Sequence, residues 1–394
     1  MKISFCWLLL LCLFTGTGYA QERPAQKITS FKFEELHGGL IVIKARVGNA
    51  ADTLNFILDT GSGRISIDSN SAVRCGLNIS ATNDSVSGIG GYRRIQRVYN
   101  TQMHMPGLTV DSLDLNVNNY EGLTASFGTR IDGLIGYSFI NRYILDVNFD
   151  SSLITVYTKG AISYPRKSYT WKFKLAYLAS TQLMVRDYTR TAGQYYIDTG
   201  GGLCMLFTEE FQRDSSLFSA RKKMVHTQVD GMAGKTDVRL TTVREMRLGP
   251  YKFRNVPAYI YNDRENALGY PSAAGLIGND ILRRFNWILN YSKKEMNLLP
   301  NANFYDEFDY AYTGLGIYQV DSVIMITDVI TGSPGQRAGL HPGDIIVSAD
   351  NVLSTGYNIA QIKAALQNTK RELHIIFIRD GDIRDTYIKV ESII

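Results

Sequence analysis

Two copies of one tripeptide constrain this chain more than any other feature. Asp59-Thr60-Gly61 follows the apolar run Phe56-Ile57-Leu58, and Asp198-Thr199-Gly200 follows Tyr195-Tyr196-Ile197. Short apolar runs of this kind are typical of buried strands, and Asp and Gly favour the turns that end them. Two acids, each placed in a turn at the end of a buried strand, predict a reaction centre that uses paired carboxylates.

The surroundings of the two turns also repeat. Leu134-Ile135-Gly136 recurs 142 residues later as Leu276-Ile277-Gly278, and the two aspartates are 139 residues apart. Glycine-bearing hairpin candidates lie between these landmarks in both halves, at 88–91 and 231–234. An ordered set of matches at one offset indicates an internal repeat, so we expect a duplicated all-β lobe of about 130 residues.

The N-terminal residues 1–20 have the features of a signal peptide. Lys2 precedes an apolar run at 5–14 that is too short to span a membrane, and Gly18-Tyr19-Ala20 supplies small residues for cleavage. Cys12 lies inside the apolar run rather than after it, which favours plain secretion over a lipoprotein. No later segment has the length of apolar sequence that a transmembrane helix needs, so we expect an exported protein, periplasmic or extracellular, with no transmembrane span in the mature chain.

Composition excludes several other classes. The formal net charge of +5 is spread along the chain without a Lys/Arg block, which argues against a nucleic-acid partner. Five histidines are scattered without metal-ligand spacing, so we expect no metal and no cofactor. After cleavage only Cys75 and Cys204 remain, and buried free thiols are favoured over a bridge.

Paired carboxylates in facing turns have a defined chemistry. At hydrogen-bonding distance two negative charges repel, so one acid holds a proton and the other is ionised. The ionised acid can take a proton from a water molecule while the protonated acid donates to a substrate carbonyl oxygen. Thr60 and Thr199 can bond to backbone across the junction, and Gly61 and Gly200 let backbone N–H groups approach the carboxylates.

With these motifs the chain resembles the pepsin-like and retropepsin-like aspartic proteases. The resemblance covers about residues 30–300, with lobes expected at 28–162 and 168–300, shorter than pepsin lobes and longer than a retroviral subunit, as in bacterial secreted members. It implies Asp59 and Asp198 as the catalytic pair in a cleft between the lobes, covered by one or two flap hairpins. Gly90 and Tyr92 are the flap candidates.

The second motif departs from the family pattern. Ser62 follows the first motif, and its hydroxyl is expected to bond the outer oxygen of Asp59; Gly201-Gly202 follows the second, where these families usually carry Ser or Thr. Loss of a donor to the charged form raises a pKa. We therefore expect either that Asp198 is the protonated partner or that the site is weakened or inert.

Residues 308–394 resemble a PDZ domain, a β-sandwich with two helices. Gly314-Leu315-Gly316-Ile317 is similar to the carboxylate-binding loop, and the segment 338–344 is similar to the turn before the fourth strand. The resemblance implies that the N–H groups of Leu315, Gly316 and Ile317 bind a peptide C-terminus, with the peptide added as a strand. The alternative is a PDZ domain that only packs on the protease and regulates access.

Together these features predict a mainly β, duplicated two-lobe aspartic-protease-like fold followed by a PDZ domain. The expected function is an exported endopeptidase acting on proteins or peptides, and a monomer suffices because both acids lie in one chain. The alternative is a catalytically inactive protease fold that binds peptides or serves as a scaffold.

Overall fold

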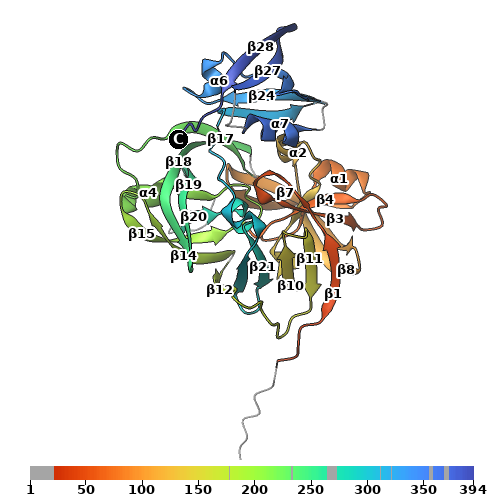
Figure 1. Ribbon diagram of the computed structural model, residues 1–394. Coiled ribbons are helices and arrows are strands. Elements are labelled where there is room, and N and C mark those ends of the chain that lie inside the picture. The colour runs from red at the N-terminus through yellow and green to blue at the C-terminus, as the bar shows by residue number, and fades with distance from the viewer. Residues whose placement is uncertain are drawn as a thin grey trace, which may run out of the picture.

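A computed structural model describes residues 22–176, 178–231, 234–263, 273–310, 312–320, 322–354, 358–367 and 372–394. The expected signal peptide at 1–20 lies outside the described residues. Figure 1 shows two β lobes side by side and a third unit above them, which contains the C-terminal strands. The predicted fold class is confirmed, because strands predominate and the C-terminal unit has its own sheet. Among the described helices, none is long and apolar enough to cross a membrane.

The N-lobe is built on one sheet with the strand order β2-β3-β4-β9-β5-β8-β7-β6. Its inner strands carry apolar residues on both faces; in β4, for example, four of the five residues are fully buried. The strands are β2 (Glu34–Glu35), β3 (Ile41–Val47), β4 (Leu54–Leu58), β5 (Ser66–Asp68), β6 (Ile79–Gly88), β7 (Gly91–Met105), β8 (Leu108–Asn118) and β9 (Gly133–Ile135).

The C-lobe repeats this sheet strand for strand, in the order β13-β14-β15-β20-β16-β19-β18-β17. Each sheet also has one pairing outside this order, and the two correspond: β3 pairs with β7 in the N-lobe, and β14 pairs with β18 in the C-lobe. The predicted duplication is therefore present in the topology. The strands are β13 (Lys174–Leu175), β14 (Ala179–Arg186), β15 (Arg190–Ile197), β16 (Met205–Thr208), β17 (Val225–Gly231), β18 (Gly234–Leu248), β19 (Tyr251–Tyr261) and β20 (Ala273–Ile277).

A third sheet joins the lobes, in the order β1-β11-β10-β21-β22-β12. At its centre the equivalent strands of the two lobes pair antiparallel, with Leu145 opposite Leu289, so the pairing relates the lobes by an approximate two-fold axis. The strands are β1 (Lys27–Lys32), β10 (Ile144–Asn148), β11 (Leu153–Tyr157), β12 (Tyr169–Lys172), β21 (Phe285–Asn290) and β22 (Glu295–Pro300).

The helices of the lobes are short and their ends follow capping chemistry. Asp68 caps α1 by accepting from the N–H groups of Asn70 and Ser71. Gly128 ends α2 in the left-handed region, at φ +64°. The helices are η1 (His37–Gly39), α1 (Ser69–Arg74), α2 (Glu121–Phe127), α3 (Tyr137–Ile140), α4 (Glu209–Ser215), α5 (Asn279–Leu282) and η2 (Ala302–Tyr305).

The C-terminal unit has a separate hydrophobic core, which includes Ile317, Ile326 and Leu366. Ser333 caps α6 and Pro334 occupies its first turn. The sheet has the order β23-β24-β25-β27-β28, with β26 beside β25. The elements are β23 (Leu315–Val320), β24 (Val323–Val329), α6 (Pro334–Arg337), β25 (Ile345–Ala349), β26 (Val352–Leu353), α7 (Ile359–Leu366), β27 (Glu372–Arg379) and β28 (Asp382–Lys389).

Candidate active site

The two Asp-Thr-Gly turns meet where the lobes join. Each aspartate follows a buried strand, β4 or β15, and its backbone N–H donates to a neighbouring strand. Asp59 N bonds to Ile135 O at 2.9 Å, and Asp198 N bonds to Ile277 O at 3.0 Å. The apolar-apolar-Gly elements that repeat in the sequence are thus the strands β9 and β20, which hold the two turns in equivalent positions.

Thr60 and Thr199 link the two turns. The N–H of Thr60 donates to Thr199 Oγ1 at 3.0 Å, and the N–H of Thr199 donates to Thr60 Oγ1 at 3.0 Å. The two hydroxyls in turn donate to carbonyl oxygens of the opposite lobe, from Thr60 to Ile197 at 2.7 Å and from Thr199 to Leu58 at 2.8 Å. All four bonds are buried, so they fix the position of one turn relative to the other.

The glycines allow the carboxyl groups to come together. A Cβ at Gly61 would lie 2.7 Å from Asp198 Oδ1 and 3.1 Å from Asp59 Oδ1, so both inner oxygens surround the same point. A Cβ at Gly200 would collide with the Asp59 carboxyl group. Any side chain at Gly61 or Gly200 would separate the acids, which explains why the turns need glycine there.

Burial and mutual repulsion control the protonation of the pair. Burial raises the pKa of Asp59 well above its usual range, and the charge of Asp198 adds to the rise. Burial also raises the pKa of Asp198, but the hydrogen bond with Asp59 and the N–H groups of Gly200 and Gly201 act in the opposite direction. The N–H groups of Gly61 and Ser62 lower the pKa of Asp59 in the same way. The two buried carboxyl groups therefore share one proton.

The expected hydrogen bond from the Ser62 hydroxyl to Asp59 is absent from the part of the chain that the structure describes. The Ser62 hydroxyl donates to Arg64 O at 2.9 Å, so its proton is used within the loop. Asp198 Oδ1 accepts from Gly200 N at 2.9 Å and from Gly201 N at 3.1 Å. Asp59 Oδ1 accepts from Gly61 N at 2.7 Å in the same way, so backbone N–H groups support the inner oxygens of both acids.

Two hairpins cover the acids, one from each lobe. They are formed by β6 with β7 and by β17 with β18, as the glycine pairs predict. Their tips touch: a Cβ at Gly231 would collide with the backbone of Ile89, and Gly90 N donates to Tyr261 OH at 3.4 Å. Gly90 is thus part of a flap tip. Tyr92 lies in the same hairpin, opposite Ser87, but its side chain is 56% exposed and does not line the cavity.

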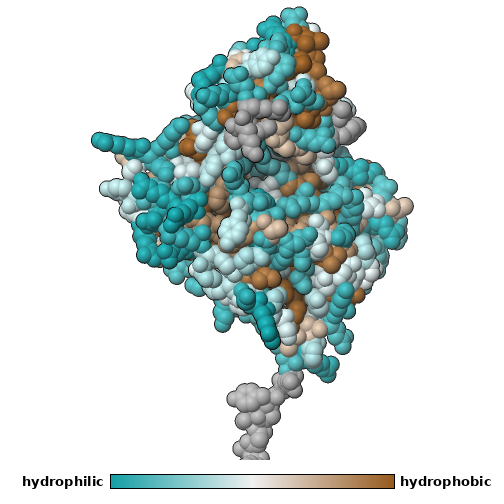
Figure 2. All heavy atoms as spheres, in the orientation of Figure 1, coloured by the Kyte–Doolittle hydropathy of each residue, from teal (hydrophilic) through white to brown (hydrophobic). Residues whose placement is uncertain are grey.

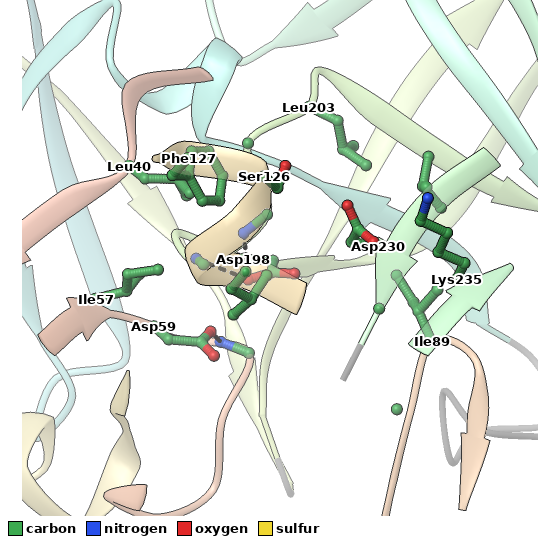
Figure 3. A pocket seen from close by; sticks show the side chains of 18 of the residues that line it. Leu40, Ile57, Asp59, Ile89, Ser126, Phe127, Asp198, Leu203, Asp230 and Lys235 are labelled. Atoms are coloured by element: carbon green, nitrogen blue, oxygen red, sulfur yellow. Dashed lines mark hydrogen bonds between the residues drawn. The ribbon is translucent and has the colours of Figure 1, made fainter. Parts of the chain in front are cut away.

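The acids face a cavity of about 1180 Å³. Figure 3 shows Asp59 and Asp198 at one side, Ile89, Asp230 and Lys235 of the flaps at the other, and Ser126 and Phe127 of α2 above the acids in this view. The sequence did not single out these flap and α2 residues, because their position depends on how the hairpins and α2 fold over the turns.

The C-terminal unit closes part of this cavity. Leu315, Gly316 and Ile317, the proposed carboxylate-binding residues, line the same space as the acids. Lys363 Nζ of α7 donates to Ser126 O at 2.6 Å. Figure 2 shows a largely hydrophilic outer surface over the lobes on the face in view.

A second contact joins the C-terminal unit to the C-lobe flap. Tyr318 donates to Asp230, and Lys235 Nζ lies 4.1 Å from the centre of the Tyr318 ring. Thr227 Oγ1 also donates to Asp328 at 3.4 Å. The unit is therefore held by both lobes at once, through α2 on one side and the flap on the other.

Two duplicated β lobes, each presenting an Asp-Thr-Gly turn at a shared junction, define an aspartic protease fold. The chain belongs to the aspartyl protease family, whose model matches residues 43–139 and 182–281. A PDZ domain model matches residues 325–380. The predicted family and the C-terminal PDZ domain are thereby confirmed.

Among solved structures, the chain is similar to the aspartic proteinase from Irpex lacteus. The two chains are 11% identical, with a TM-score of 0.41, over 71% of this chain and 98% of that chain. No curated protein sequence matches the chain.

Proposed function

We propose that this protein is an exported aspartic endopeptidase in which Asp59 and Asp198 activate a water molecule. The observation that carries the proposal is the burial of two hydrogen-bonded carboxyl groups at the edge of a large cavity. The ionised acid of the pair takes a proton from the attacking water, and the protonated acid donates to the oxygen of the scissile carbonyl. The tetrahedral intermediate then collapses with a proton delivered to the leaving amine, and no covalent enzyme intermediate forms.

Substitution of each acid tests this proposal. Asp59→Asn and Asp198→Asn should each abolish cleavage of an unfolded protein substrate between acidic and neutral pH, and a statine-type inhibitor should block the wild type. Asp146→Asn is the matched control, since Asp146 is a partly buried acid of the interlobe strand β10 that does not line the cavity. Unchanged cleavage by Asp59→Asn would refute the proposed role of the pair.

For the PDZ domain we propose that it binds peptide C-termini and regulates access to the cleft. A peptide added as a strand beside β23 would face α7. The end of α2 lies in this region, because a Cβ at Gly128 would collide with Ile359 of α7 and lie 2.6 Å from Gln319 Oε1 of β23. The N-lobe thus competes with a bound peptide, which supports a role in restraining the cleft until a C-terminal peptide displaces α2.

A second candidate function is a peptide-binding protein with an inactive protease fold. The observation that favours it is the position of the PDZ domain, which narrows the approach to the acids. Inhibitor-sensitive turnover by the full chain would eliminate this candidate. Absence of turnover together with tight binding of C-terminal peptides would support it.

A further inference from the structure

One wall of the cavity is a row of residues from neighbouring strands of the N-lobe sheet. Leu134 of β9 lies opposite Ile57 of β4 and Ser66 of β5, and Asn116 of β8 lies opposite Ser66 and Arg97 of β7. Residues directly opposite on paired strands project from the same face of a sheet. All five residues line the cavity that contains the two acids. The row begins with the apolar Ile57 and Leu134 and ends with the polar Asn116 and Arg97.

The polar half of this wall contains three buried atoms without a hydrogen-bond partner among the residues the structure describes. They are Asn116 Oδ1, Asn118 Oδ1 and Arg97 Nε. Asn116 is 8% exposed and Asn118 is 5% exposed, and both line the cavity two positions apart on the same face of β8. Buried polar groups in folded proteins are normally paired, and an unpaired one costs about 1–3 kcal/mol.

The neighbours of these side chains fix their orientation and charge. Asn118 Nδ2 donates to Tyr120 OH at 3.1 Å, and Tyr120 OH lies 2.6 Å from Ser66 Oγ, so Asn118 Oδ1 is directed away from this pair. Arg97 Nη2 forms an ion pair with Asp84 at 2.8 Å. The charge of Arg97 is therefore already balanced, and what it offers the cavity is one N–H donor rather than an unpaired cation.

We propose that the polar half of this wall, made of Arg97, Asn116 and Asn118, is a subsite for the side-chain carboxamide of a substrate glutamine or asparagine. This inference rests on the proposed endopeptidase function and names its substrate class. A carboxamide oxygen accepts from Arg97 Nε, and its NH2 group donates to Asn116 Oδ1 and Asn118 Oδ1. The three unpaired atoms are satisfied by a single group.

Other substrate side chains leave at least one of these three atoms without a hydrogen bond. A carboxylate can accept from Arg97 but has no N–H for the two amide oxygens, and Asp84 already balances the arginine charge. An apolar side chain leaves all three atoms unpaired. A site built on hydrogen bonds discriminates strongly against analogues that lack them, so we expect a preference of at least about tenfold for Gln over Glu and Met.

The test uses the full chain and a library of peptides that vary one position at a time around a cleaved bond. At one position, kcat/KM should be at least about tenfold higher with Gln or Asn than with Glu or Met. Asn116→Leu should remove this preference and favour Met at the same position. Arg97→Met, at the less buried end of the row, should do the same if Asn116→Leu does not fold. Gln96→Leu is the matched control, because Gln96 is an exposed amide on the same strand that does not line the cavity.

Binding separates this inference from the proposed catalysis. Calorimetry with statine-core peptides that carry Gln, Glu or Met should give the same order of affinity. Selective binding of the Gln peptide without turnover would overturn the catalytic proposal and support the subsite. Turnover or binding that favours Glu or shows no preference would overturn the subsite, as would a failure of all three peptides to bind.

Discussion

Thr60 and Thr199 each accept a hydrogen bond from the other's backbone N–H, at 3.0 Å in both directions. This reciprocal pair connects two lobes whose motifs are 139 residues apart in the chain. The position of each carboxyl group relative to the other therefore depends on residues that do not take part in the chemistry.

Replacing Thr60 by valine should lower both stability and activity. The change leaves Thr199 N and Ile197 O without partners in a buried junction, so the free energy of unfolding should fall by roughly 2–4 kcal/mol. Urea unfolding and kcat measurements check this. Thr241→Val is the control, because Thr241 is equally buried and donates to Lys223 O at 2.8 Å outside the cavity. If Thr60→Val keeps full kcat, the junction does not position the acids.

Stability should decrease as pH rises because of Asp59. Its pKa is raised in the folded state, so its contribution is fully present below the unfolded pKa of about 3.9 and is lost as pH rises through the folded value. Asp59→Asn should therefore flatten the fall in the free energy of unfolding as pH rises above about 4. Urea titrations at several pH values measure this, with the exposed Asp237→Asn as control. Parallel curves for the wild type and Asp59→Asn would contradict the raised pKa of Asp59.

Gly201→Ser should shift the acidic limb of the pH profile to lower pH. A Cβ at this position would lie 3.0 Å from Asp198 Oδ2, close enough for a hydroxyl to donate to that oxygen. An added donor favours the ionised form and lowers the pKa of Asp198. The profile of kcat/KM against pH reports the shift. Gly201→Ala adds the Cβ without the donor, and identical profiles for the two variants would argue against this explanation.

Gly128→Ala should loosen the PDZ domain from the N-lobe. The new Cβ collides with Ile359, so hydrogen exchange in β23 and α7 should become at least about tenfold faster, equivalent to about 1.4 kcal/mol, and cleavage of a small peptide should increase. Gly76→Ala is a close control: Gly76 also follows a helix at φ +64°, but a Cβ there has open space. Equal effects of both variants would attribute the change to backbone strain, which costs about 1–2 kcal/mol.

The repeat allowed much of the fold to be predicted. The same motifs recur at nearly the same spacing in both halves of the sequence, so we expected them to occupy equivalent positions in two lobes. The sheets of the two lobes have equivalent strand orders. Glycine pairs at 88–91 and 231–234 predicted both flaps. Tyr92 lies in a flap hairpin, but its side chain faces solvent, because at the tip of a hairpin a shift of one residue decides whether a side chain faces the cavity or solvent.

The roles of individual polar groups were harder to predict from the sequence. Ser62 suggested a donor to Asp59, yet its hydroxyl donates to Arg64 O within its own loop. The sequence did not indicate Asn116 or Arg97 as site residues, since each is one polar residue in a strand of alternating polar and apolar residues. They meet only because β7 and β8 pair in a particular register.

By itself, the sequence determined the family, the pair of acids, the duplication and the presence of a PDZ domain. These depend on local patterns: apolar runs that form strands, and turns that require Asp and Gly. The tertiary structure decided how deeply the two acids are buried, which side chains form the polar wall, and where the PDZ domain lies relative to Asp59 and Asp198. Burial, strand register and contacts between domains set these properties, and each depends on residues that are distant along the chain.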